Sequence, residues 1–419
     1  MTGSRTLAPS TLAPSTLAPS TLALCVVAAL LVAAGPAAAQ KKYDIGASDS
    51  EIKIGQTQPY SGPASAYGTI GRAEAAYFQM INDQGGVNGR KINLISLDDG
   101  YSPPKTVEQI RRLVEQDQVL FVFQTLGTPS NTAIQKYLNA RGVPQLFVAT
   151  GATKWGDPQN FAWTIGWQPS YHAESTIYAK YILRERPNAK IAVLYQNDDY
   201  GKDYRDSLRL GLGAKAGLIV KEASYEVTDP SIDSQIVTLQ AAGADTLFIF
   251  ATPKFAAQAI RKTYDIGWKP FQFVNNVSAS VATVLQPAGL EKSVGLITSA
   301  YIRDPTDPQW SKEKSFKDWV EWMKKYYPQG DLADVFNVYG YSAAQTLVQL
   351  LKQCGDDLTR ENVMRQAASI KNLELPMLLP GIRLNTSPTD FYPIEQMQLA
   401  RFDGKRWVLV GEVINAESR

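Results

Sequence analysis

From Glu51 onward the chain alternates between short strand-like runs and amphipathic helix-like runs, and this alternation most constrains its fold. The runs "EIKIGQTQ", "KINLISLD", "VLFVFQ" and "VPQLFVA" are separated by helix-like segments such as "PPKTVEQIRRLVEQ". Short, continuously apolar strands between amphipathic helices are typical of a parallel sheet that is covered on both faces. The pattern therefore predicts an α/β fold with a doubly wound sheet.

The same alternation occurs a second time, in "AKIAVLY", "LIVKEASY", "DTLFIFA" and "FQFVNN". Between these strands we expect one helix over residues 202–216 and another that begins near Pro230. Long helical segments follow the turn-rich stretch 304–308, and two final strands are joined by the hairpin signal Asp403-Gly404. Two doubly wound sheets joined by a hinge place a ligand between the carboxyl ends of their strands. We expect a first lobe of residues 46–165 and 302–378, and a second lobe of residues 166–301 and 379–419.

The N-terminus has the features of a secretory signal peptide. A five-residue low-complexity repeat over residues 6–23 leads into an apolar stretch that ends at Ala37-Ala38-Ala39. An apolar region closed by an Ala-x-Ala site predicts export and removal of residues 1–39. Cleavage leaves Cys354 as the single cysteine, which excludes an internal disulfide and suits the periplasm of a Gram-negative bacterium. We expect Cys354 to be a helix core residue.

Composition argues against several classes of function. The formal net charge is +2, which gives no electrostatic reason to expect a nucleic-acid partner. His172 is the single histidine, so a multi-histidine metal site is impossible and a Ser-His-Asp triad would depend on this one residue. The pair Asp98-Asp99 ends a strand, and we interpret it as a solvated turn. We therefore expect no metal, no cofactor and no enzyme activity.

Four strand ends carry small residues, hydroxyls or aromatic rings: "QPYSGPASAYG", "QTLGTPSNTA", "VATGATKW" and "YQNDDYGKD". In the second, Gly127, Thr128 and Ser130 stand where a helix is expected to begin, and free N–H groups there favour an anion. The hydroxyls of Thr150 and Thr153 would add hydrogen bonds, although serine and threonine also cap helices. Tyr67 ends the first stretch and would form a flat wall over a ligand.

The stretches "YSGPASAYG", "INDQGGVNGRKINLISLDD", "GVPQLFVATGAT" and "IAVLYQNDDYG", in this order, resemble the leucine/isoleucine/valine-binding type of periplasmic solute receptor. The resemblance covers nearly all of the mature chain. It implies a two-lobed type I periplasmic binding protein that serves the permease subunits of an ABC importer, and we expect a monomer. In that family two loops hold the α-carboxylate of the ligand and aromatic residues flank it. The matching positions are Gly127, Thr128, Ser130, Gly151 and Thr153 for the loops, and Tyr67 and Tyr200 for the aromatics.

Two departures from the family pattern bear on the ligand. The early disulfide of the family would fall near Tyr101 and Leu126, and it is absent here. Amino-acid binders also carry an acid on the second lobe that pairs with the ammonium of the ligand. Simple counting puts Val277 at that place, and the nearest polar residues are the uncharged Asn275 and Asn276.

Burying an ammonium without a counter-ion is strongly unfavourable. The expected ligand is therefore a small carboxylate without an α-ammonium, such as an aromatic acid, with Tyr67, Trp155, Tyr200 and Phe255 suited to its ring. Three alternatives stay open: an amino acid whose ammonium is met by Asp198, Asp199 or Glu226; a ligand sensor for a signalling partner; and an exported hydrolase or lyase with a carboxylate pair.

Overall fold

The structure is a computed structural model that describes residues 41–416, so the predicted signal peptide lies outside the described residues. The first sheet has five parallel strands in the order β3-β2-β4-β5-β6. Its strands are β2 (Glu51–Gln58), β3 (Lys91–Asp98), β4 (Phe121–Phe123), β5 (Gln145–Val148) and β6 (Thr164–Gly166). A small parallel pair, β1 (Lys42–Tyr43) and β12 (Asp357–Leu358), lies outside it.

The second sheet has seven strands in the order β14-β13-β11-β10-β9-β7-β8. They are β7 (Ile191–Gln196), β8 (Ile219–Tyr225), β9 (Thr246–Phe250), β10 (Phe271–Val274), β11 (Ile297–Ala300), β13 (Gln396–Phe402) and β14 (Trp407–Asn415). The first five are parallel to one another, whereas β13 and β14 form an antiparallel hairpin on β11, as the Asp403-Gly404 signal predicts.

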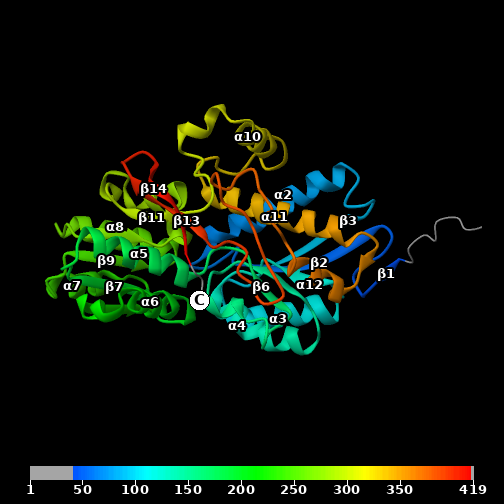
Figure 1. Ribbon diagram of the computed structural model, residues 1–419, viewed down its shortest axis with the longest axis horizontal. Coiled ribbons are helices and arrows are strands. Elements are labelled where there is room, and N and C mark those ends of the chain that lie inside the picture. Colours follow the sequence, from blue (N-terminus) through cyan, green and yellow to red (C-terminus); the bar gives the residue numbers. More distant parts are fainter. Residues whose placement is uncertain (1–40, 417–419) are drawn as a thin grey trace, which may run out of the picture. The chain divides into compact units, whose positions relative to one another are not determined.

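Helices cover both faces of the first sheet, with α2 and α11 on one side and α3 and α4 on the other (Figure 1). They are α2 (Gly68–Asp83), α3 (Pro103–Glu115), α4 (Thr128–Ala140) and α11 (Val335–Cys354), and α10 (Lys314–Tyr326) and α12 (Arg360–Ala367) complete this half. The second sheet carries α5 (Tyr171–Glu185), α6 (Asp199–Leu212), α7 (Asp233–Ala241), α8 (Pro253–Asp265) and the short α9 (Gln286–Ala288).

The two faces of each sheet bury separate sets of apolar side chains. On β7, Ile191 and Val193 belong to the core under α5 and α6, whereas Ala192 and Leu194 belong to the core under α7 and α8. This period of two is what a strand buried on both faces requires. Doubly wound α/β packing, as the sequence predicts, is therefore present in both sheets.

Both parallel sheets have the same internal strand order, in which the second strand lies beside the first and the third lies on its other side. In each sheet the chain changes the side on which it adds strands. This change occurs between β2 and β4 in the first sheet, and between β7 and β9 in the second. Open α/β sheets bind ligands at such switch points, at the carboxyl ends of the strands. The fold thus directs attention to the four loops that follow these strands.

The sequence-based helix boundaries are partly wrong. The helix expected over residues 202–216 is α6, which begins at Asp199 because Asp198 caps it through the N–H groups of Tyr200 and Gly201. The helix expected to begin near Pro230 begins at Asp233. Residues 379–394 contact the first half, since the hydroxyl of Tyr392 donates to the Thr153 carbonyl. We therefore propose that the second lobe resumes near residue 395.

Candidate functional site

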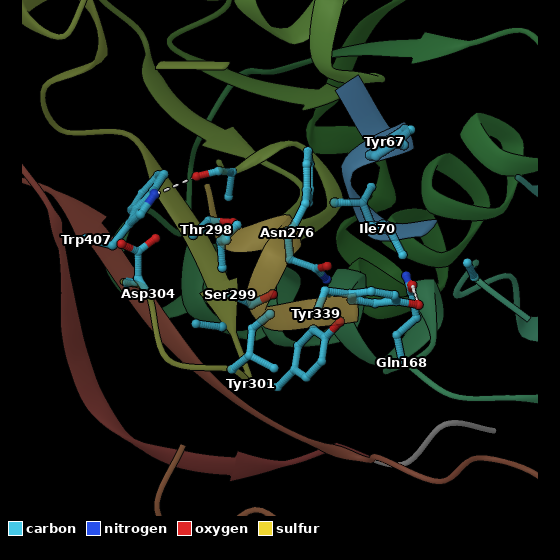
Figure 2. A pocket seen from close by; sticks show the side chains of 18 of the residues that line it. Tyr67, Ile70, Gln168, Asn276, Thr298, Ser299, Tyr301, Asp304, Tyr339 and Trp407 are labelled. Atoms are coloured by element: carbon cyan, nitrogen blue, oxygen red, sulfur yellow. Dashed lines mark hydrogen bonds between the residues drawn. The ribbon is translucent and has the colours of Figure 1, made fainter. Parts of the chain in front are cut away.

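One cavity is lined by loops from both sheets and by the segments that connect them (Figure 2). Tyr67 follows β2, Thr128 follows β4, Tyr200 follows β7 and Thr252 follows β9, so all four switch-point loops contribute a side chain. The connecting segments contribute Gln168 and Tyr301. The cavity therefore lies where two doubly wound sheets are expected to hold a ligand.

Four tyrosines form the wall near α4. They are Tyr67, Tyr101, Tyr171 and Tyr200, each at most 6% exposed. Burial raises the pKa of all four phenols, so the hydroxyls stay protonated and can donate hydrogen bonds. The Tyr67 hydroxyl lies 3.5 Å from that of Ser278, across the cavity from its own helix. The Tyr67 side chain therefore extends from the first half of the molecule to the second.

The start of α4 borders the cavity through Gly127 and Thr128. Gly127 has a φ of 97°, and a Cβ there would lie 2.6 Å from a ring carbon of Tyr101. Among the described residues no group accepts a hydrogen bond from the backbone N–H of Thr128 or Ser130. Because these donors stand at the positive end of a helix, this edge of the cavity suits a carboxylate.

The other loop residues predicted from the sequence do not line the cavity. The hydroxyl of Thr150 lies 2.6 Å from that of Thr128, and Thr150 itself does not line the cavity. The Ser130 hydroxyl donates to that of Thr106, which in turn donates to the buried carboxylate of Asp99. Asp99 is fully buried, which corrects its interpretation as a solvated turn residue. Gly151 is needed for close packing, since a Cβ would lie 2.5 Å from the Pro169 carbonyl oxygen.

Thr153 contacts the second half of the molecule instead of the cavity. Its backbone N–H and hydroxyl donate to the carboxylate of Asp203 at 2.6 and 2.9 Å. The neighbouring Lys154 pairs with Asp199 at 2.6 Å. These contacts join the loop after β5 to helix α6, so this loop holds the two lobes together and its backbone is used for that contact.

The two predicted asparagines have different roles. Asn275 is fully buried, and its amide oxygen accepts from the Tyr200 hydroxyl while its nitrogen donates to the carbonyls of Ile249 and Ala251. It therefore fixes Tyr200 and does not reach the cavity. Asn276 lines the cavity, but its backbone N–H and its amide nitrogen both donate to Glu174, at 2.8 and 2.6 Å.

Glu174 of α5 is a buried acid that the sequence analysis did not single out. It is fully buried and also accepts from the hydroxyls of Tyr178, Tyr204 and Ser299. Burial raises its pKa, although the surrounding donors lower it in part. Five donors occupy its two oxygens, and the side chain does not line the cavity. This carboxylate is therefore not placed to receive a ligand ammonium.

The remaining acids and rings proposed from the sequence also lie elsewhere. Asp198 caps α6, Asp199 pairs with Lys154, and Glu226 accepts from Asn197. Trp155 donates to Thr150 and Phe255 packs against Tyr225, so neither ring lines the cavity. Cys354 is buried at the end of α11, as expected, and burial raises the pKa of its thiol to about 12.

The cavity continues away from the tyrosine wall to an end that the sequence analysis missed. Figure 2 shows Asp304 and Trp407 at one side and Tyr67, Ile70 and Gln168 at the other. Asp304, Asp307 and Trp310 come from the segment after β11, and Trp407 and Leu409 come from β14. The cavity is therefore elongated and mostly aromatic and aliphatic, with carboxylates near one end.

Within residues 41–416 no cluster of three or more histidine, cysteine or acidic side chains is arranged to hold a metal ion. Over the same residues no helix has the length and apolar character needed to span a bilayer.

Gln168 is an unusual polar member of the wall. Its oxygen accepts from the Tyr339 hydroxyl at 3.0 Å, whereas its buried amide nitrogen has no partner among the described residues.

Residues 51–406 match the sequence profile of the family described as "Periplasmic binding protein". The chain belongs to the periplasmic binding protein family. As a member of this family it is an exported, periplasmic binding protein rather than an enzyme. The family resemblance seen in the sequence is confirmed.

Named relatives of this periplasmic binding protein include a Leu/Ile/Val-binding protein homolog 1 of Brucella suis biovar 1, which is 26% identical over 324 residues. That match covers 75% of this chain and 82% of the relative. Two solved structures share the fold. A branched-chain amino acid ABC transporter protein of Thermus thermophilus with bound valine has a TM-score of 0.80, at 17% identity over 89% of this chain and 98% of that one.

The second structure is a fatty acid ABC transporter substrate-binding protein of Thermomonospora curvata, with a TM-score of 0.76. It is 22% identical, over 90% of this chain and 96% of that one. These two structures confirm the type I periplasmic binding protein fold. One is named for branched-chain amino acids and the other for fatty acids, so the shared fold does not determine the ligand of this binding protein.

Proposed function

We propose that this binding protein captures a small carboxylate with an apolar body and no α-ammonium, such as an aromatic acid, for an ABC importer of a Gram-negative periplasm, and that it acts as a monomer. One observation carries the proposal. The start of α4, with the free N–H group of Thr128, borders a cavity whose adjoining wall is made of tyrosines and contains no unpaired acid. The N–H group suits a carboxylate, and the rings suit an apolar body.

The alternative is an α-amino acid, which the name of the Brucella relative favours. An α-ammonium lies one carbon from the carboxylate and would need an acceptor beside α4. Glu174 is the buried acid of the second half, and its hydrogen-bonding positions are occupied by five donors. The absence of a free acid at this end of the cavity favours a ligand without that charge.

Calorimetric titration of the signal-peptide-free protein tests the proposal with benzoate, 4-methylbenzoate and hexanoate against leucine and valine. We expect at least one simple acid to bind at least tenfold more tightly than either amino acid. The corresponding amides, benzamide and hexanamide, are the matched controls and should bind at least tenfold more weakly than the acids, because they lack the negative charge. Tight leucine binding with no binding of the simple acids would establish the amino-acid alternative.

Asp203 gives a prediction about closure of the two lobes around the ligand. Periplasmic binding proteins close by hinge motion, and the contacts of Asp203 with Thr153 join the lobes in this structure. Charge-assisted hydrogen bonds contribute about 1.5–3 kcal/mol, so Asp203→Ala should weaken ligand binding about tenfold. The effect should appear mainly as faster ligand dissociation in stopped-flow fluorescence, because Asp203 does not line the cavity.

Asp206→Ala is the control for that experiment. Asp206 lies on the same helix, is exposed, and pairs with the adjacent Arg205. Surface ion pairs contribute little, so its dissociation rate should match that of the wild type within about twofold. Equal rates for the two variants would mean that the Thr153–Asp203 contact does not hold the closed form.

A further inference from the structure

The end of the cavity at Asp304 contains polar atoms that the protein leaves without partners. One carboxylate oxygen of Asp304 accepts from the backbone N–H and the hydroxyl of Thr306, at 2.8 and 2.5 Å. Its other oxygen has no hydrogen-bond partner among the described residues. The hydroxyl of Thr298, a residue only 2% exposed on the same wall, also has none among them. A carboxylate oxygen without a protein partner on a cavity wall can accept a hydrogen bond from a ligand.

No cation of the described chain neutralises Asp304. The neighbouring acid, Asp307, is paired with Arg406 at 2.7 Å. The adjacent Arg303 pairs with Glu313 and donates to the Leu378 carbonyl, and its guanidinium lies 4.8 Å from the centre of the Trp310 ring. Asp304 lines the cavity and is partly exposed. Burial among protein atoms raises the pKa of its carboxyl group to about 6. At pH 7.5 it is an ionised carboxylate that lacks a counter-ion.

Aromatic rings surround this carboxylate. Trp310 and Trp407 line the same end of the cavity, and the indole N–H of Trp407 is used by the Ala279 carbonyl at 2.7 Å. Tyr301 stands between this end and the tyrosine wall (Figure 2). A carboxylate together with the faces of aromatic rings is the combination that proteins use to hold ammonium groups.

We propose that the Asp304 end of the cavity binds a protonated amine at the far end of the ligand, which makes the substrate class ω-amino carboxylates. This inference rests on the proposed function, because the other end of the ligand is the carboxylate at α4. Asp304 and Tyr67 stand at opposite sides of the cavity (Figure 2), so the two charges are separated by an apolar body. An α-amino acid places its charges too close together to reach both ends.

Matched ligand pairs test the proposal by calorimetry at pH 7.5. The pairs are 6-aminohexanoate with hexanoate, and 4-(aminomethyl)benzoate with 4-methylbenzoate. In at least one pair we expect the amine to bind at least tenfold more tightly than its unsubstituted partner, because the ammonium supplies the missing counter-ion. The variant Asp304→Asn should reduce this ratio to about threefold or less, since its amide oxygen stays on Thr306 and its NH₂ group then faces the ammonium.

The matched control is Asp318→Asn, which changes an exposed acid of α10 and should keep the wild-type ratio. Circular dichroism melting of Asp304→Asn checks that the variant is folded, and its affinity for the unsubstituted acid should stay within about threefold of wild type. If that affinity is retained while the amine preference also survives, Asp304 is not the acceptor and the inference is overturned.

The sign of the pH dependence is also fixed. The charged groups near Asp304 are Asp307, Arg406 and Arg303. Asp307 and Arg406 form an ion pair with each other, and Arg303 pairs with Glu313. As pH falls through about 6, Asp304 of the free protein takes up a proton that an ammonium must displace. The preference for the amine should therefore be largest at pH 7.5 and fall toward pH 5, and it should not depend on pH in Asp304→Asn.

Failure of this inference can be separated from failure of the proposed function. Binding of hexanoate and 4-methylbenzoate without any gain from the amine refutes the inference alone. Equal binding of hexylamine and 6-aminohexanoate refutes the carboxylate end and leaves the amine end standing. If no member of either pair binds, both are refuted.

Discussion

Replacing Glu174 with glutamine is expected to lower the free energy of unfolding by about 2–4 kcal/mol, because a buried acceptor of five hydrogen bonds becomes a mixed donor and acceptor. The new NH₂ group would face the Tyr204 hydroxyl and the amide nitrogen of Asn276. Tyr204 can rotate its hydroxyl, but the amide nitrogen of Asn276 has only hydrogens to offer. Urea unfolding followed by tryptophan fluorescence measures the loss.

Glu185→Gln is the matched control, since Glu185 lies on the same helix, is exposed, and pairs with the adjacent Arg184. Its free energy of unfolding should stay within about 0.5 kcal/mol of wild type. An equally small effect of Glu174→Gln would mean that the desolvation of the buried charge cancels its hydrogen bonds. In that case the placement of Asn276 does not depend on Glu174.

The effect of Glu174→Gln should also vary with pH in a known direction. Burial raises the pKa of Glu174, so the folded protein binds a proton more readily than the unfolded chain does. The stability that this group contributes therefore grows as pH falls through its folded pKa toward the ordinary glutamate value. Glutamine cannot take up the proton, so the difference between wild type and variant should widen at lower pH.

Loops at strand ends were predictable from sequence because their signal is local. "TLGTPSN" combines a glycine, hydroxyls and a helix start, and the structure places Gly127 and Thr128 on the cavity wall. The sequence does not show which neighbouring hydroxyl faces inward. Ser130 turns toward Thr106, and Thr153 turns toward Asp203, since each finds a partner from a distant element. Those partners are set by packing between elements, which one sequence does not reveal.

The two acids that matter most had no local signal at all. Glu174 follows a capped helix start and resembles an ordinary solvent-facing glutamate, and its burial depends on donors from α5, α6, β11 and the loop after β10. Asp304 belongs to a Pro- and Asp-rich stretch that is typical of a turn. It becomes part of a cavity wall only because the C-terminal hairpin brings Trp407 to the same end of the cavity.

Replacing Gly127 with alanine is expected to abolish detectable ligand binding and to destabilise the protein by about 2–5 kcal/mol. Two effects combine. A φ of 97° is strained for any residue with a Cβ, at about 1–3 kcal/mol, and this Cβ would lie 2.6 Å from the Tyr101 ring. Relief of either strain moves the N–H groups of α4 or the tyrosine wall, and the proposed carboxylate site needs both in place.

Two glycines elsewhere separate these effects. Gly217 has an ordinary φ and open space around its Cβ position, so Gly217→Ala should change the free energy of unfolding by at most about 0.5 kcal/mol. Gly213 has a φ of 53° and equally open space, so Gly213→Ala reports the backbone strain alone, about 1–2 kcal/mol, and should leave binding intact. Urea unfolding and calorimetry on the three variants give both quantities. If Gly127→Ala costs no more than Gly213→Ala and still binds benzoate or hexanoate, the close approach of Tyr101 to the start of α4 is not what shapes the site.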